Sequence, residues 1–173
     1  MKFKSLLFCL LITLCISCEA TRQMHSKSFI GQHPAKAEFP IPVGAINDFD
    51  NILSDEQETT LVRLLKDYEA ETDTEIVIVT VTSLLDYTGL VEYSLDLSNY
   101  WGIGEKDKEN GVLIALYMKD RRVWIHNGVG VIQKLTDEEA LNIINKTILP
   151  EFKKNDFYNG FQKGIKAVIE ELK

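Results

Sequence analysis

After residue 50, segments with apolar residues at helical spacing alternate with continuous runs rich in β-branched residues. Helical spacing predicts four helices in this part of the chain. Two of them begin with the spacing of a capping box, formed by Ser54 with Gln57 and by Thr136 with Glu139. Pro150 is expected to end the third helix, because proline lacks the backbone N–H that a continuing helix needs. The helices are expected to begin near Ser54, Thr88, Thr136 and Asp156.

Three segments between these helices have the composition of strands. The segments 75–83 and 111–117 are nearly continuous apolar runs, which are typical of strands covered on both faces. The segment 123–126 returns after a charged turn and predicts a hairpin with the strand before it. The order of helices and strands predicts an α/β fold, a three-layer α/β/α sandwich around a small mixed sheet.

The first 18 residues have the pattern of an export signal. Lys2 and Lys4 precede an apolar run that ends at Ser17 and is shorter than the roughly 20 residues of a membrane-spanning helix. Leu14-Cys15-Ile16-Ser17-Cys18 resembles the lipobox of bacterial lipoproteins, so we expect a lipid on Cys18. The chain is then exported and held in the cell envelope, at a membrane facing the periplasm or the cell surface. Cleavage after Ala20, releasing a soluble protein, is the alternative.

The remainder of the chain divides into a tether and a domain. Residues 19–40 are polar, contain two prolines and lack apolar periodicity, which predicts a flexible tether. Residues 41–173 suffice for one domain with its own core. All three cysteines lie in the signal segment, so the domain has no thiol chemistry.

Charge limits the partners of this domain. The full chain carries −7, of which residues 1–18 contribute +2 and residues 19–40 contribute +1, so the domain carries −10. Such a surface repels nucleic acid and attracts cations or basic protein partners. We therefore expect no nucleic-acid partner.

Oxygen-bearing side chains gather in two parts of the domain. The first group is Asn47, Asp48 and Asp50 before the first helix, with Asp55 in its first turn. The second group lies in a glycine-bearing loop before the second buried strand and consists of Glu105, Asp107, Glu109 and Asn110. Calcium and magnesium prefer such carboxylate and amide oxygens. Alternatively, these residues simply occupy turns, or their negative charge stabilises the N-terminus of a helix.

Sheet topology bears on which of these groups meet. A right-handed crossover makes the two buried strands parallel, so residues 102–110 enter the sheet at its N-terminal edge. Asp86 and Asp120 follow the carboxyl ends of the strands, where ligands of open α/β sheets usually bind, and Asp48 is expected near Asp86. The sequence leaves open whether these residues form one metal site or two.

Several short motifs occur in a characteristic order, and together they resemble the TPM-domain family over residues 41–173. The resemblance implies an exported or membrane-anchored α/β/α domain that binds calcium or magnesium and assists the assembly or maintenance of membrane complexes. It also implies acid phosphatase activity in some members. Glu109 stands where relatives tend to carry aspartate. The motifs are Val43-Gly44-Ala45-Ile46-Asn47-Asp48, Trp101-Gly102-Ile103-Gly104, Asn110-Gly111-Val112-Leu113, Asp120-Arg121, Gly128-Val129-Gly130 and Asp156-Phe157-Tyr158-Asn159-Gly160 with Gly164.

The leading interpretation is therefore an envelope-anchored cation-binding module with a protein partner. A metal-assisted acid phosphatase, with Arg121 or Arg122 clamping the phosphate, and a metal-free partner-binding domain are the alternatives. No residue is an evident general acid or nucleophile. The segment 128–130 lacks the third glycine of a dinucleotide loop, so no organic cofactor is expected. His126, the domain's single histidine, is expected to be a packing or edge residue of its strand.

Overall fold

The computed structural model of the chain describes residues 39–104 and 107–173. The predicted signal segment with Cys18, the predicted tether up to residue 38, and residues 105–106 with Glu105 of the second group lie outside the described residues. Nowhere in the described ranges does a helix have both the length and the apolar composition to cross a membrane.

A mixed sheet of four strands lies at the centre of the domain, in the order β1-β2-β3-β4. β1 is parallel to β2, β2 is parallel to β3, and β4 is antiparallel to β3. The three predicted strands are confirmed, but β1 was missed because it has only three residues and two of them are polar. The strands are β1 (Ile46–Asp48), β2 (Glu75–Val81), β3 (Gly111–Tyr117) and β4 (Arg122–Asn127).

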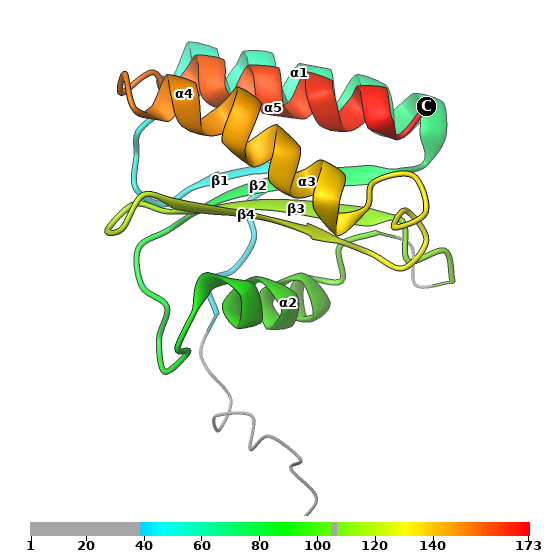
Figure 1. Cartoon of the computed structure of the whole chain (residues 1–173), viewed down its shortest axis with the longest axis horizontal. Coiled ribbons are helices and arrows are strands. Elements are labelled where there is room, and N and C mark those ends of the chain that lie inside the picture. Colours follow the sequence, from blue (N-terminus) through cyan, green and yellow to red (C-terminus); the bar gives the residue numbers. More distant parts are fainter. Residues whose placement is uncertain (1–38, 105–106) are drawn as a thin grey trace, which may run out of the picture. The chain divides into compact units, whose positions relative to one another are not determined.

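Helices cover both faces of the sheet, so the α/β/α sandwich is confirmed (Figure 1). α2 (Leu90–Trp101) lies on one face, with a small core that includes Val79, Leu97 and Ala115. The other helices lie on the opposite face over a larger core built around the alternate strand residues Ile78 and Ile114. Those helices are α1 (Asp55–Thr72), α3 (Asp137–Ile143), α4 (Leu149–Phe152) and α5 (Phe157–Glu171).

The third predicted helix does not end at Pro150. α3 continues through a π-helical turn, η1 (Ile144–Ile148), directly into α4, where Pro150 lies in the first turn. Proline in a continuing helix leaves one carbonyl of the preceding turn without its N–H partner, and here that preceding turn is the wider π-helical one. Gly160 of α5 leaves the space that the Phe152 ring of α4 fills.

Residues 39–44, here called the strap, connect the α2 layer to β1. The Phe39 ring lies 5.3 Å from that of Tyr93 and 5.8 Å from that of Tyr87, measured between centroids. The indole N–H of Trp101 donates to the Pro40 carbonyl over 2.8 Å. The chain therefore enters the domain against α2.

Candidate functional site

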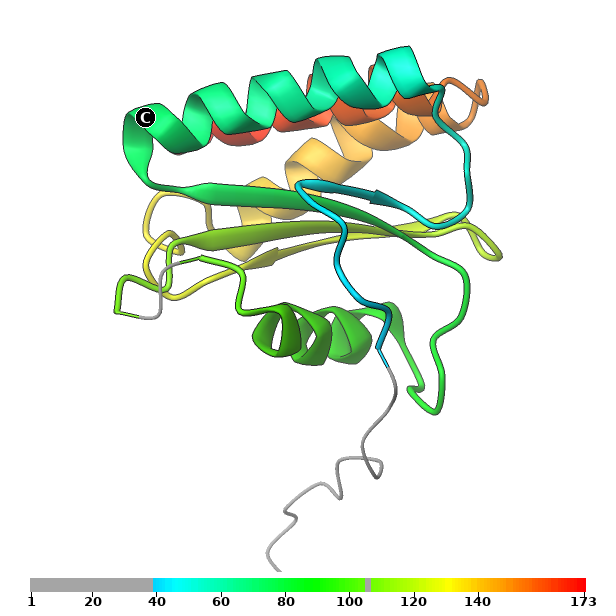
Figure 2. The same ribbon diagram turned by 180° about the vertical axis from the view of Figure 1, so that it is seen from behind.

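The carboxyl ends of β1, β2 and β3 meet at one edge of the sheet, because these strands are parallel (Figure 2). Asp48 is the last residue of β1, and Asp50 lies in the turn that follows. Asp86 lies in the loop from β2 to α2, and Asp120 lies in the turn between β3 and β4. Four of the predicted oxygen ligands therefore come from segments that leave the sheet at this edge.

Thr80 joins the two aspartates of β1 and its turn. The Thr80 side chain is fully buried in β2, and its hydroxyl donates to Asp48 Oδ1 over 2.9 Å. The same hydroxyl accepts from the backbone N–H of Asp50 over 2.9 Å, and Asp48 Oδ2 accepts from the Leu53 N–H over 2.8 Å. We call Asp48, Asp50 and Thr80 the β1 corner.

Negative charge is crowded at the β1 corner. Burial raises the pKa of the Asp50 carboxyl, and the neighbouring Asp48 charge raises it further. Asp50 Oδ2 is buried and makes no hydrogen bond to any described residue. Burial and the charges of Asp48 and Asp55 also raise the pKa of Glu58, on the first turns of α1. A cation would relieve this repulsion.

The other carboxylates of this edge do not join the corner. Asp86 is exposed in its loop. Asp120 forms an ion pair with Arg122 over 2.9 Å. Arg121 donates to the Phe152 carbonyl and, over 2.8 Å, to Asn155 Oδ1, so it holds the hairpin against the turn between α4 and α5. Both arginines considered as phosphate clamps thus have protein partners.

The second predicted group lies at the opposite edge of the sheet, where β3 begins. Asn110 is buried, and its amide donates to the Asp73 carbonyl over 2.5 Å. Lys108 forms an ion pair with the Asp73 carboxylate over 3.0 Å. Asp107 and Glu109 are exposed. β3 separates this group from Asp120, so the predicted ligands fall into two places.

Glycines bring three of the sequence motifs together at this second edge. A Cβ on Gly111 would overlap the Ile103 carbonyl, and a Cβ on Gly128 would overlap the Glu109 carbonyl. The Gly128 N–H donates to the Gly111 carbonyl over 2.8 Å. These positions need glycine because one backbone segment packs directly on another here, and this is why the glycine motifs stand out in the sequence.

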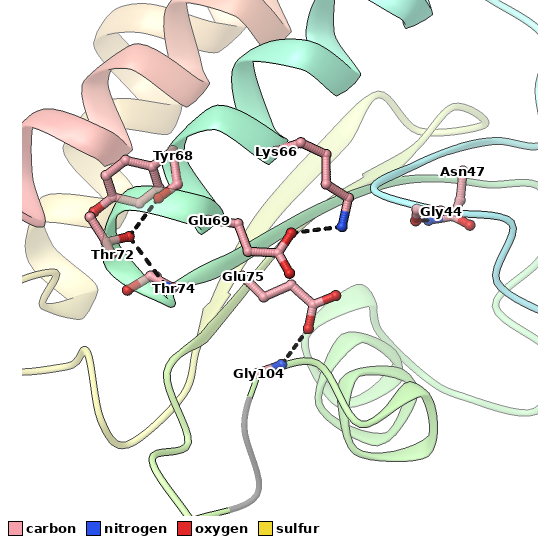
Figure 3. Close-up of polar contacts among 9 residues, drawn as sticks. All are labelled: Gly44, Asn47, Lys66, Tyr68, Glu69, Thr72, Thr74, Glu75 and Gly104. Atoms are coloured by element: carbon pink, nitrogen blue, oxygen red, sulfur yellow. Dashed lines mark hydrogen bonds and ion pairs between the residues drawn. The ribbon is translucent and has the colours of Figure 1, made fainter.

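Glu75, at the start of β2, closes the same edge (Figure 3). Its carboxylate accepts from the Gly104 N–H over 2.6 Å, beside the ion pair of Lys66 with Glu69. A polar groove of about 400 Å³ runs between these residues. Neither Glu75 nor Thr80 is predicted from the sequence to be a site residue, because one polar residue in an apolar strand carries no spacing signal.

A second cavity, of about 450 Å³, opens between α2, the loop after it and the end of β4. Its lining includes Leu95, Glu109, His126 and Val129. His126 is partly buried at an edge strand, which fits the expected edge role, and burial lowers the pKa of its imidazole against an opposing effect of Asp137.

Comparisons with known proteins agree with this architecture. An N-terminal domain from P. gingivalis, solved by NMR in solution, is 29% identical, with a TM-score of 0.68 over 74% of this chain and 81% of its own. The BA42 protein of the psychrophilic bacterium Bizionia argentinensis is 22% identical, with a TM-score of 0.62 over 72% of this chain and 83% of its own. An N-terminal domain from Corynebacterium glutamicum is 18% identical, with a TM-score of 0.59 over 80% of this chain and 87% of its own.

The last two likenesses concern the fold alone. No curated protein matches this chain in sequence. The family model of the TPM domain matches residues 46–171, which is most of the chain. The chain belongs to the TPM-domain family.

Proposed function

We propose that this TPM-domain chain is an envelope-anchored module that binds calcium or magnesium at the β1 corner and assists a membrane complex through a protein partner. The observation that carries the proposal is Asp50 Oδ2, a buried carboxylate oxygen without a hydrogen bond to any described residue, beside the Asp48 carboxylate. Carboxylates that repel each other in the folded protein are a common starting point for a hard-cation site.

The donor chemistry of the corner fits a hard cation. Asp48 and Asp50 would supply carboxylate oxygens, and the Thr80 hydroxyl holds Asp48 and the Asp50 backbone in place. Within the described ranges no three His, Cys, Asp or Glu side chains lie together in positions to hold one ion. Calcium completes its six to eight oxygen ligands with waters and backbone carbonyls. Weak binding, with a Kd of about 0.1–1 mM, is therefore expected, as in other extracellular modules.

Calorimetric titration of the full chain with Ca²⁺ and with Mg²⁺ tests this proposal. Heat of binding is expected for the native chain and for Glu109→Gln, and it is expected to disappear in Asp50→Asn. Both changes remove one charge from an acidic residue, but Glu109 lies at the other edge of the sheet. Loss of binding in Glu109→Gln alone would place the ion at the second group, with Asp107 and Asn110, and would overturn the assignment to the corner.

The anchor and the partner are part of the same proposal. Lipid on Cys18, in the lipobox-like segment, would hold the domain at a membrane while its acidic surface faces a basic partner. Metabolic labelling with a fatty-acid analogue tests the anchor: label is expected on the native chain and not on Cys18→Ala. Equal labelling of the two chains, or none on either, would remove the anchor from the proposal.

The phosphatase alternative has less support. Its phosphate clamp needs a guanidinium with unused donors, whereas Arg121 and Arg122 are engaged with neighbouring oxygens. Turnover of an aryl phosphate by the full chain, abolished in Asp48→Ala, would favour this alternative over the binding module.

A further inference from the structure

The cavity beside His126 has the size and lining of a small-molecule site. Its volume of about 450 Å³ lies within the range of roughly 300–1,000 Å³ for ligand pockets. Leu95, Ile103 and Val129 contribute apolar surface, and Leu95 and Val129 remain exposed to solvent. It lies at the N-terminal edge of β3, away from the β1 corner.

Two walls of the cavity are set by backbone rather than by movable side chains. Gly111 packs against the Ile103 carbonyl, and Gly128 packs against the Glu109 carbonyl, each too closely to admit a Cβ. The N–H of Gly128 also donates to Gly111 over 2.8 Å. Walls of this kind keep their shape when empty, so a ligand would pay little conformational entropy to enter.

His126 presents an unused hydrogen-bonding group to this space. Its register partner in the sheet is Leu113, which packs in the core under α2, so both side chains lie on the α2 face. The imidazole makes no hydrogen bond with any other described residue. A neutral imidazole carries one donor and one acceptor nitrogen, which can bond a ligand that enters the cavity.

Charge narrows the class of ligand. Glu109 is the one acidic residue among the described residues that line the cavity, and no lysine or arginine is found among them. The whole domain is acidic as well. An anionic ligand would meet like charge at the mouth, whereas an uncharged or cationic molecule would not.

We propose that this cavity binds a small organic molecule, uncharged or cationic, with an apolar body against Leu95 and a hydrogen-bonding group on the His126 imidazole. The site is independent of the cation site at the β1 corner. It would give the domain a second ligand on the α2 side of the sheet, where the strap also enters.

Three probes with one ring and different charge test the proposal. The full chain carrying Cys18→Ala, which avoids competition from lipid, is titrated with benzyl alcohol, benzylamine and benzoate and followed by NMR. Saturable shifts of the His126 ring and of the Gly102 and Gly128 amides are expected with the alcohol and the amine, and not with benzoate. No saturable shift with any probe, or equal binding of benzoate, would overturn the proposal.

Matched variants locate the binding. Leu95→Ala is expected to weaken benzyl alcohol binding about tenfold by removing apolar contact. Leu141→Ala, a residue of equal 44% exposure on α3, is expected to leave binding unchanged. The chain with its native His126 should bind benzyl alcohol more tightly than toluene. His126→Phe, which keeps a ring but no nitrogen, should bind the two molecules equally. Equal effects of the two leucine changes, or a benzyl alcohol preference that survives His126→Phe, would contradict the assigned site.

Discussion

The hydroxyl of Thr80 donates to Asp48 Oδ1 across the β1–β2 pair, over 2.9 Å. Because the same hydroxyl accepts from the Asp50 N–H, one buried side chain orders both aspartates of the corner. Strand pairing places it there, since Asp48 and Thr80 are register partners of β1 and β2. The position of the proposed cation site is thus set by the parallel pairing of a three-residue strand.

Thr80→Val tests this role of the hydroxyl. Valine has nearly the same shape, but it leaves Asp48 Oδ1 and the Asp50 N–H without their partner. The free energy of unfolding is expected to fall by about 2 kcal/mol, measured by urea denaturation. Thr60→Val, at an exposed position of α1, is the control and should change it by less than about 0.5 kcal/mol. An equal loss of unfolding free energy in the two variants would mean that the Thr80 hydroxyl does not order the two aspartates.

Asp50→Asn is expected to stabilise the metal-free protein at neutral pH. Burial and Asp48 raise the pKa of Asp50 in the folded state, so its ionised form is favoured in the unfolded chain. Ionisation of Asp50 therefore lowers the stability of the folded state. This loss of stability is absent below the unfolded carboxyl pKa of about 3.9, and it grows as the pH rises from there through the raised pKa of the folded state.

Melting temperatures measured in the presence of chelator test whether Asp50→Asn stabilises the protein. Asp50→Asn should melt above the native chain at pH 7, and the two should converge at pH 3. Asp86→Asn, which changes an exposed carboxylate, is the control and should follow the native chain at both values. A lower melting temperature for Asp50→Asn at pH 7 would mean that the carboxylate stabilises the corner without a cation.

Phe39 is expected to fix the strap to α2. Phe39→Ala removes ring contacts with Tyr87 and Tyr93 and with Tyr100, whose centroid lies 5.4 Å away, and should lower the free energy of unfolding by about 2 kcal/mol. Ile41→Ala, two residues along at 79% exposure, should change it by less than about 0.5 kcal/mol. Chemical denaturation of the full chain measures both, and similar losses would mean that the strap is held elsewhere.

Gly128→Ala is expected to disrupt the edge at which the motifs meet. The new Cβ would overlap the Glu109 carbonyl, and displacing backbone should cost about 3 kcal/mol of unfolding free energy. Gly89→Ala has open space around the added carbon, so it should cost at most about 1 kcal/mol as a weaker helix cap. Thermal melts of the two variants make the comparison. A small effect at Gly128 would mean that the segments are not closely packed.

The sequence predicted the layers of this fold better than its site. Continuous apolar runs identified β2 and β3 because both strands are covered on both faces. β1 was missed because a strand of three residues has no period to detect, and so the pairing of Asp48 with Thr80 had no signal either. Asp48 and Asp50 were chosen by residue type, and only the register of β1 shows that they share a hydroxyl.

Other differences also come from tertiary packing. The glycine motifs were visible, but the close approach of Gly111 to the Ile103 carbonyl depends on how the loop folds back over β3. Pro150 predicted a helix end, yet a π-helical turn before it lets the helix continue. The effect of a single proline depends on the turn in front of it, which residue spacing does not describe.

Residue-resolved NMR of the full chain during a calcium titration in initially metal-free buffer tests the central claim most directly. The amides of Asp48, Asp50 and Leu53 are expected to shift first and saturably, with Mg²⁺ shifting the same set and chelator reversing it. Amides that respond only around Asn110, or no response to either ion, would contradict a cation site at the β1 corner.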